Sequence, residues 1–534
     1  MLPPLPSLDA YDISPHNGFL PEEPPLEVLP DPYYTKWEAV VKHLQALVLS
    51  KRLREVVQDL PVITTSRLRR PAEWRRAYSL LSLMTHAYIW GGDRPEEVLI
   101  HSLAHDEKEA DILQIVPPSI SIPFTQVCAY LELPTVATYS GLCLWNWKTI
   151  FDDEPIDSLD NLSTLSTITG SLDESWFYLI SVAIEARGGP TIPLMLRAIA
   201  AAEDDDIQIV TECLHVFAER LDELGSLLIR MYENCDPHVF YHRIRPFLAG
   251  SKNMADAGLP RGVLFDTDTG RDKYVQYGGG SNAQSSLFQF FDIVLGIEHA
   301  PTGSSLKPND PNDPSQAPPP RHNFIHEMRS YMPGPHRRFL SHISSVANIR
   351  PFIATHKSNK PLTIAYDACL AMLRSLRDKH MQMVSRYIIV KSHESRNQNQ
   401  RSLSPRAAPS TQPAPMNLAS ANVKQIDGKE GPDAARKKLR GTGGTALIPF
   451  LKQARDETGE PAVDDWFRRT MTSRQDKGRG RENEGIAKGS GKEKGKGFAN
   501  LGSAHERADG EVEIVGLSAV WRVDDEGGGG ICHW

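Results

Sequence analysis

The sequence lacks the features that would place a protein in a membrane or outside the cell. No uninterrupted apolar run approaches the roughly 18 residues of a membrane span. The first residues, MLPPLPSLDAYD, have neither the basic start nor the apolar block of a secretory signal. The six cysteines form no CxxC pair, which argues against a disulfide framework or a zinc site; they are Cys128, Cys143, Cys213, Cys235, Cys369 and Cys532. We therefore expect reduced thiols, a cytoplasmic location and no membrane as a partner.

Positive charge is also in short supply. The chain has 59 Lys and Arg against 67 Asp and Glu, a formal net charge of −8. This balance favours solubility and argues against nucleic acid as a partner. Apolar residues make up 40% of the 534 residues, slightly below the globular average, so part of the chain should lie outside a packed core. The length still suffices for two or three domains.

The sequence indicates a mainly α-helical protein with two domains. Residues 1–160 predict a smaller, mostly helical amino-terminal domain, although SISIPF at 119–124 is typical of a brief extended segment. Residues 161–455 predict a large, all-helical domain, in which the apolar residues after about position 207 keep the three- and four-residue spacing of a buried helix face. An acidic, Ser- and Thr-rich connection at 152–174 suggests the boundary.

Two further segments do not fit a packed domain. Residues 392–440 are polar, and we expect a mobile loop there, within the large domain. Residues 461–534 are rich in glycine and charge and cannot bury enough apolar surface to offset the entropy of ordering, so they predict a disordered, low-complexity tail. One apolar island, EVEIVGLSAVW at 511–521, either docks to a partner or forms transient structure.

The most informative segment is AYDACLAMLRSLRDKHMQMVSRYIIV at 365–390. Its apolar residues recur at helical spacing, and His380 lies among them on the same face. A neutral imidazole in an apolar wall suits the proximal ligand of a haem iron. A single histidine on such a face is more often an ordinary core residue, however, and periodicity alone does not choose among the 18 histidines of the chain.

The wording of this segment resembles the proximal-histidine helix of the indoleamine 2,3-dioxygenase family. Other segments resemble the family in the same order along the chain: LPDPYYTKWE, AYIWGG, LELP with WNWK, WFYLISVAIEA at 176–186, VFYHRIRPFLAG at 239–250, GGGSNAQSSLFQFFDIVLGI at 278–297, MRSYMPGPHRRFL at 328–340 and GTGGT at 441–445. The resemblance covers about residues 10–455, and it is to a fungal-type member with a carboxy-terminal extension. Several separate motifs in the right order are much more specific than one.

The resemblance implies a mainly α-helical dioxygenase that carries haem b, with its iron. It implies oxidation of L-tryptophan by O2 to N-formylkynurenine, the first step of the kynurenine pathway towards NAD, by a monomer with an electron donor that keeps the iron ferrous. Two alternatives stay open: a haem-binding sensor or low-activity homologue, and a dioxygenase for another indole.

The resemblance also assigns residues. His380 corresponds to the metal ligand, and Arg377 to the arginine beside the haem propionates, paired with Asp292. Gly280, Ser281 and Ala283 belong to the loop over the haem edge. The catalytic residues on the other haem face correspond to Ser181, Phe240 and Arg245, and the substrate-binding residues to Tyr139, Phe177, Phe240, Arg245 and Thr442.

The chemistry explains these residue types. A buried cation such as Arg245 suits a carboxylate, and aromatic rings suit the flat indole. Two positions depart from the family pattern. Asn282 replaces a small residue of the loop, and Tyr178 stands where a second phenylalanine is more usual.

Overall fold

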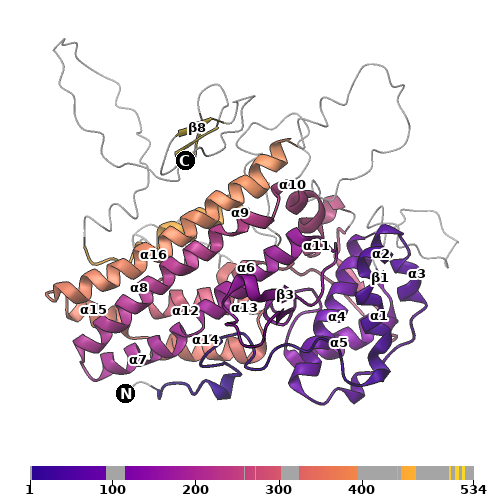
Figure 1. Cartoon of the computed structure of the whole chain (residues 1–534), viewed down its shortest axis with the longest axis horizontal. Coiled ribbons are helices and arrows are strands. Elements are labelled where there is room, and N and C mark those ends of the chain that lie inside the picture. The colour runs from indigo at the N-terminus through magenta and orange to yellow at the C-terminus, as the bar shows by residue number, and fades with distance from the viewer. Residues whose placement is uncertain are drawn as a thin grey trace, which may run out of the picture.

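The computed structural model describes residues 3–91, 115–257, 259–270, 272–301, 324–394, 442 and 447–464, and the backbone of three strands within 504–522. Helices dominate these ranges, which confirms the prediction of a mainly α-helical protein (Figure 1). None of the described helices could cross a lipid bilayer, judged by length and hydropathy. The expected loop at 392–440 lies outside the described residues, apart from its first three positions, which end a helix.

A first group of helices gathers at one side of the molecule (Figure 1). It comprises α1 (Thr35–Lys42), α2 (Leu44–Leu49), α3 (Leu53–Gln58), α4 (Pro71–Trp90) and α5 (Pro118–Leu131). Helix α4 begins with proline, whose missing N–H would have no helical partner there. Nearly all its residues from Ala77 on are buried, so α4 is the central helix of this group.

The expectation of an extended segment at 119–124 is wrong, because these residues lie in α5. Pro118 takes the first helical position, and the buried residues Ile120, Phe124 and Val127 recur at helical spacing. The short window at 119–124 hid this period, since the pattern becomes clear only when the residues that follow are included.

The second group contains the longest helices. It comprises α6 (Leu172–Gly188), α7 (Thr191–Glu203), α8 (Ile207–Ile229), α9 (Met231–Asn234), α10 (Pro237–Val239), α11 (Arg245–Leu248), α12 (Ser286–Val294), α13 (Phe324–Arg329), α14 (Gly334–Val346), α15 (Ile349–Thr355), α16 (Lys360–Val384) and α20 (Leu447–Glu457). Helices α8 and α16 lie side by side over much of their length (Figure 1). The predicted apolar face of α8 is confirmed, since Val210, Leu214, Phe217, Leu221, Leu224 and Leu228 are all buried.

Helical turns of other types complete this architecture. Three are π-helical, with wider turns than an α-helix: η5 (Ser140–Leu144), η7 (Phe240–Ile244) and η10 (Ser385–Val390). The others are 3-10 turns: η1 (Asp9–Tyr11), η2 (Pro32–Tyr34), η3 (Thr65–Arg67), η6 (Leu159–Asn161), η8 (Ala255–Ala257) and η9 (Asn282–Gln284).

Short strands occur in both groups, including the part that we expected to be all-helical. Strand β4 (Val263–Phe265) pairs parallel with β1 (Ile115–Val116) and antiparallel with β5 (Tyr274–Val275). Strand β2 (Trp147–Thr149) pairs antiparallel with β3 (Leu162–Thr164). One contiguous cluster of buried apolar side chains extends through both groups of helices, and the division into two domains near residue 160 stays a prediction.

Two pieces of the expected disordered tail have defined structure. The backbone N–H groups of Val463 and Asp464 donate to the carboxylate of Asp367, and Ala462 is fully buried, so these first residues of the expected tail belong to the packed structure. Further on, β6 (Ala504–Glu506), β7 (Val512–Val515) and β8 (Val520–Arg522) form an antiparallel sheet in the order β6-β7-β8. The apolar island at 511–521 supplies all of β7 and the first two residues of β8. Its alternation of Val512 and Ile514 with charged residues is the period of a strand.

The amino-terminal segment packs against α14 of the second group. The hydroxyl of Tyr11 lies 2.8 Å from Nδ1 of His342, and Phe19 packs against Phe339 and His336. His336 is 3% exposed. Burial lowers its pKa from the ordinary 6.5 to about 4, a shift that Arg75 increases and Asp12 opposes.

This burial predicts a pH dependence of stability. Between about pH 6.5 and pH 4 the unfolded chain binds a proton at His336 that the folded protein excludes, so the free energy of unfolding falls as the pH falls. At pH 5 this amounts to about 2 kcal/mol from this one residue. His336→Phe should therefore lose about that much less stability than the parent protein between pH 7.5 and pH 5 in urea unfolding. His215→Phe, at an exposed position of α8, is the control and should keep the parent's pH dependence. If His336→Phe also kept it, the histidine would be protonated in the folded state.

Candidate active site

A cavity of about 150 Å³ lies in the second group of helices. It brings together most of the residues that the sequence singled out: Tyr139, Phe177, Phe240, Arg245, Gly280, Ser281, Ala283, His380 and Thr442. Tyr178 and Asn282, the two departures from the family pattern, line it as well. Its remaining walls are mainly apolar and include Met231, Leu248, Met383, Val384, Tyr387, Leu447 and Phe450.

His380 reaches the cavity from the last turns of α16. Burial lowers the pKa of its imidazole to about 4, and the nearby charge of Arg377 acts in the same direction. Within the described part of the chain, no group hydrogen-bonds its ring. The imidazole is therefore neutral at ordinary pH and keeps a lone pair for a metal.

The donor set around His380 decides which kind of metal group fits. Among the described residues, no three His, Cys, Asp or Glu side chains are grouped so that they could hold a metal ion. A single neutral histidine in an apolar wall does not hold a bare ion, but it fits an iron whose other ligands come from a porphyrin. Haem therefore fits the residues of this cavity.

Arg377 and Asp292 lie behind the cavity wall rather than on it. Nη2 of Arg377 donates to both carboxylate oxygens of Asp292, at 2.6 and 2.8 Å. Burial opposes ionisation of Asp292, but the charges of Arg377 and His299 outweigh it and lower the carboxyl pKa. The expected pairing of Arg377 with Asp292 is thus present, and the side chain of Asp292 is more than nine-tenths buried.

His299 extends this pair into a larger cluster that the sequence did not suggest. Its Nε2 lies 3.0 Å from Oδ2 of Asp292, and its Nδ1 lies 2.8 Å from Oε2 of Glu457. Burial alone would lower the pKa of His299, but the charge of Asp292 and the hydrogen bonds that the imidazole donates to both carboxylates raise it. No sequence signal marks this contact, because Glu457 is 158 residues further along the chain.

On another wall, aromatic rings lie beside a buried cation. The ring centroids of Phe177 and Phe240 are 5.0 Å apart, and Tyr387 approaches Phe240 edge-on at 5.6 Å. Arg245 is 1% exposed, and its guanidinium carbon lies 5.5 Å from the ring centroid of Tyr241. Burial lowers the pKa of Arg245, although the residue remains a cation at any ordinary pH.

The π-helical turn η7 explains why Phe240 and Arg245 reach the same cavity. The residues are five apart, and in an α-helix this spacing would turn them about 140° from each other. A π-helix, whose hydrogen bonds join residues i and i+5, has more residues in each turn and brings the two side chains closer to one face. Sequence periodicity read on the α-helical template would have separated them.

The glycine-rich loop is fixed by contacts with residues far away in the chain. The N–H of Gly279 donates to the carbonyl of Thr442 at 2.9 Å, and the Thr442 hydroxyl donates to the carbonyl of Gly280 at 2.6 Å. A Cβ atom on Gly279 would overlap the carbonyl oxygen of Leu248, so this approach needs glycine. Thr442, which we expected to bind the substrate, thus lies directly on the glycine-rich loop.

Comparison with known proteins agrees with this geometry. A family model described as indoleamine 2,3-dioxygenase matches residues 7–461. This chain belongs to the indoleamine 2,3-dioxygenase family. It is 39% identical over 458 residues to indoleamine 2,3-dioxygenase nanC of Aspergillus nanangensis, covering 84% of this chain and 96% of that protein. It is 38% identical to indoleamine 2,3-dioxygenase of Saccharomyces cerevisiae, covering 85% and 93%, and 36% identical to 6-hydroxytryptophan 2,3-dioxygenase fscD of Fusarium equiseti, covering 85% and 97%.

Tyr178 stands where a second phenylalanine is more usual in the indoleamine 2,3-dioxygenase family. Its hydroxyl donates to Oε1 of Glu174 at 3.0 Å, in a fully buried contact. The ring of Tyr178 therefore lines the cavity while its hydroxyl is engaged elsewhere, much as a phenylalanine would line it. Asn282 begins η9 and places a polar side chain on the wall itself.

Ser181 lies one layer behind the cavity in this dioxygenase-family fold. It is 7% exposed and is not among the lining residues, whereas Tyr139 and Cys143 line the cavity. The hydroxyl of Tyr139 donates to Oε1 of Glu185 at 2.9 Å, and Ser285 donates to the same oxygen at 2.6 Å. Sequence reasoning missed Glu185, whose carboxyl pKa is raised by burial to about 7.

Proposed function

We propose that this protein is a haem-dependent dioxygenase that converts L-tryptophan and O2 to N-formylkynurenine. The observation that carries the proposal is the shared cavity, in which a neutral histidine, aromatic walls and a buried arginine come together. The family of the chain supports the same reaction. The further properties we propose are a cytoplasmic monomer with haem b, two domains that meet near residue 160, an external electron donor and a place at the start of the kynurenine pathway.

His380 holds the iron of the haem in this proposal. Arg377, fixed by Asp292, lies three residues before it on α16 and is suited to a haem propionate. Gly280, Ser281 and Ala283 give the cofactor a wall without large side chains, although Asn282 interrupts it. When bound, the haem supplies the redox chemistry that activates O2 for addition of both oxygen atoms across the indole C2–C3 bond.

The other residues bind and orient the substrate. The Arg245 guanidinium pairs with the carboxylate of tryptophan, and the adjacent rings of Phe177 and Phe240 provide an aromatic surface for the indole. Tyr139 keeps its hydroxyl, which is bonded to Glu185, beside the reacting ring, and Ser181 adds a hydroxyl that is not a strong acid. Thr442 holds the glycine-rich loop through its hydrogen bond to the carbonyl of Gly280, and the apolar side chains of α20 exclude water from the cavity.

Turnover by the purified protein tests the reaction itself. Reduced, haem-loaded protein given L-tryptophan and O2 should form N-formylkynurenine, detected by its absorbance and by mass spectrometry. The relative from Fusarium equiseti is named for 6-hydroxytryptophan, so this compound should be assayed in parallel. A protein that binds haem and tryptophan but forms no product would be a sensor or an inactive homologue. A clear preference for 6-hydroxytryptophan would identify another indole as the substrate.

The assignment of His380 predicts a haem-free variant. His380→Ala removes the one ligand that we assign to the iron, so the protein should fold with normal far-ultraviolet circular dichroism and carry little haem. The control is His215→Ala, which removes an exposed histidine from the adjacent helix α8 and should leave haem content unchanged. The Soret absorbance relative to protein content measures the difference. A normal Soret band and full activity in His380→Ala would show that another residue binds the iron.

The assignment of Arg245 predicts a selective loss of substrate affinity. Removing one partner of a buried ion pair costs on the order of 3–5 kcal/mol, which corresponds to several hundred-fold at roughly tenfold per 1.4 kcal/mol. Arg245→Ala should therefore bind tryptophan several hundred-fold more weakly and lose its preference for tryptophan over tryptamine, which has no carboxylate. Arg243→Ala, two residues earlier and exposed, should change neither value. Equal effects of both variants on both compounds, at unchanged haem content, would make Arg245 a structural cation.

A further inference from the structure

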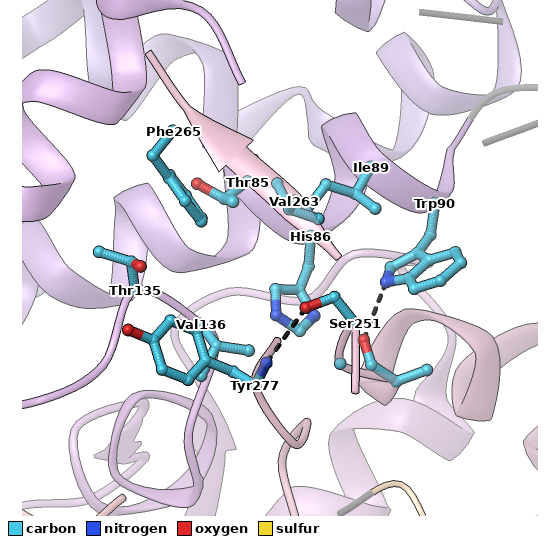
Figure 2. Close-up of a pocket in the computed structure, with 12 residues that line it drawn as sticks. Thr85, His86, Ile89, Trp90, Thr135, Val136, Ser251, Val263, Phe265 and Tyr277 are labelled. Carbon is cyan, nitrogen blue, oxygen red and sulfur yellow. Dashed lines mark hydrogen bonds between the residues drawn. The ribbon is translucent and has the colours of Figure 1, made fainter. Parts of the chain in front are cut away.

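Three segments of the chain meet beside α4, next to a second and much smaller cavity (Figure 2). Its volume is about 10 Å³, which is room for about one water molecule and for no organic ligand. Figure 2 shows His86 and Trp90 of α4 pointing towards the segments that carry Val136 and Ser251. The place is therefore a closely packed contact, called the joint below, between α4 and the segments that carry Val136 and Ser251.

One side of the joint holds the helix that begins with Arg245. Helix α11 spans only four residues, and a single helical turn is not stable by itself. Its last carbonyl groups have no partners within the helix and need donors from elsewhere. His86 Nδ1 lies 2.7 Å from the carbonyl oxygen of Phe247, and Trp90 Nε1 donates to that of Ala249 at 2.8 Å. Helix α4 thus supplies the donors that hold α11 in place.

The other side holds the segment that leads to Tyr139. The backbone N–H of Ala137 donates to Nε2 of His86 at 2.9 Å, and the hydroxyl of Tyr78 donates to the carbonyl of Val136 at 2.7 Å. His86 is thus hydrogen-bonded to both segments at once. The bonds require the neutral tautomer with its hydrogen on Nδ1, since Nε2 has to accept. Burial favours this form, because it lowers the pKa of His86 to about 4, whereas the bond to Phe247 opposes the shift.

Both segments reach the large cavity two residues away from these bonds. Arg245 precedes Phe247 by two positions, and Tyr139 follows Ala137 by two; each lines the cavity. A displacement of either backbone would therefore shift a side chain of the cavity wall. Misplacement of a binding group by about 1 Å is enough to cost large factors in affinity or rate.

We infer that His86 is a positioning residue, whose hydrogen bond to Phe247 fixes the Arg245 guanidinium in the cavity wall and so sets the selectivity for a substrate that carries a carboxylate. This inference rests on the proposed role of Arg245. It predicts that the loss of the His86 bonds impairs recognition of the carboxylate more than binding of the indole. A role in stability alone would weaken binding of both compounds equally, or of neither.

The test compares substitutions that keep one bond each. The amide N–H of Asn lies near the place of Nδ1, so His86→Asn retains a donor for Phe247. The amide oxygen of Gln lies near the place of Nε2, so His86→Gln retains an acceptor for Ala137. His86→Leu retains neither. His336→Leu is the matched control, because His336 is equally buried and lies in α14, away from both segments.

Dissociation constants of L-tryptophan and tryptamine are measured by calorimetry on the haem-loaded proteins. His86→Leu and His86→Gln should lower the ratio of tryptophan to tryptamine affinity at least about tenfold, a change of about 1.4 kcal/mol, whereas His86→Asn and His336→Leu stay close to the parent protein. If His86→Leu does not fold, the other two variants still test the inference, since the ratio of tryptophan to tryptamine affinity should be higher in His86→Asn than in His86→Gln.

Two outcomes would overturn the inference, and they are distinguishable. Parent-like ratios in the His86 variants, with a lowered ratio in Arg245→Ala, would refute the positioning role and leave the proposed function intact. A parent-like ratio in Arg245→Ala itself would refute the carboxylate site, and with it the reason for positioning it.

Discussion

Burial of the Arg245 guanidinium is costly, because a cation that leaves water loses most of its hydration. Arg245 is 1% exposed, at the wall of a cavity whose other sides are largely aromatic and aliphatic. The surrounding chain holds it firmly: Tyr241 presents its ring, and His86 and Trp90 of α4 bind the carbonyls that follow. The carboxylate of an amino acid substrate would offset the desolvation that the fold imposes on this cation, so the arrangement favours an anionic ligand.

The π-helical turns have a shared consequence for the cavity. Each of the three supplies lining residues, among them Cys143 from η5, Phe240 from η7 and Tyr387 from η10. A π turn spreads its side chains differently from an α-helix and is less favourable in isolation, so it persists where packing on several sides determines it. Helix α6 packs against η5 and η7, and η7 packs against η10, so these irregular turns support one another as walls of the cavity.

Comparison of particular residues shows how far sequence reasoning reached. The spacing of Leu214 and Phe217 predicted the buried face of α8 because a long amphipathic helix repeats its signal many times. The order of the family motifs predicted that His380 and Arg245 lie in one site, and these residues, 135 positions apart in the sequence, line one cavity. The contact of His299 with Glu457 could not be predicted, since tertiary packing alone brings a loop and a distant helix together. Ser181 was placed on the wall, but it lies behind it, because helix spacing gives the face and not the depth.

The two arginines near the cavity have different surroundings, and this difference gives the site a direction. Arg377 makes a two-pronged bond to Asp292, and His299 joins Asp292 to Glu457, so that opposite charges balance within this cluster. The same bonds attach α20, which supplies part of the apolar wall, to α12 and α16. Arg245 instead faces the cavity beside aromatic rings. A zwitterionic ligand with an aromatic ring is therefore expected to turn its carboxylate towards Arg245 and its ring towards Phe177 and Phe240, because these three residues line the cavity and Arg377 does not.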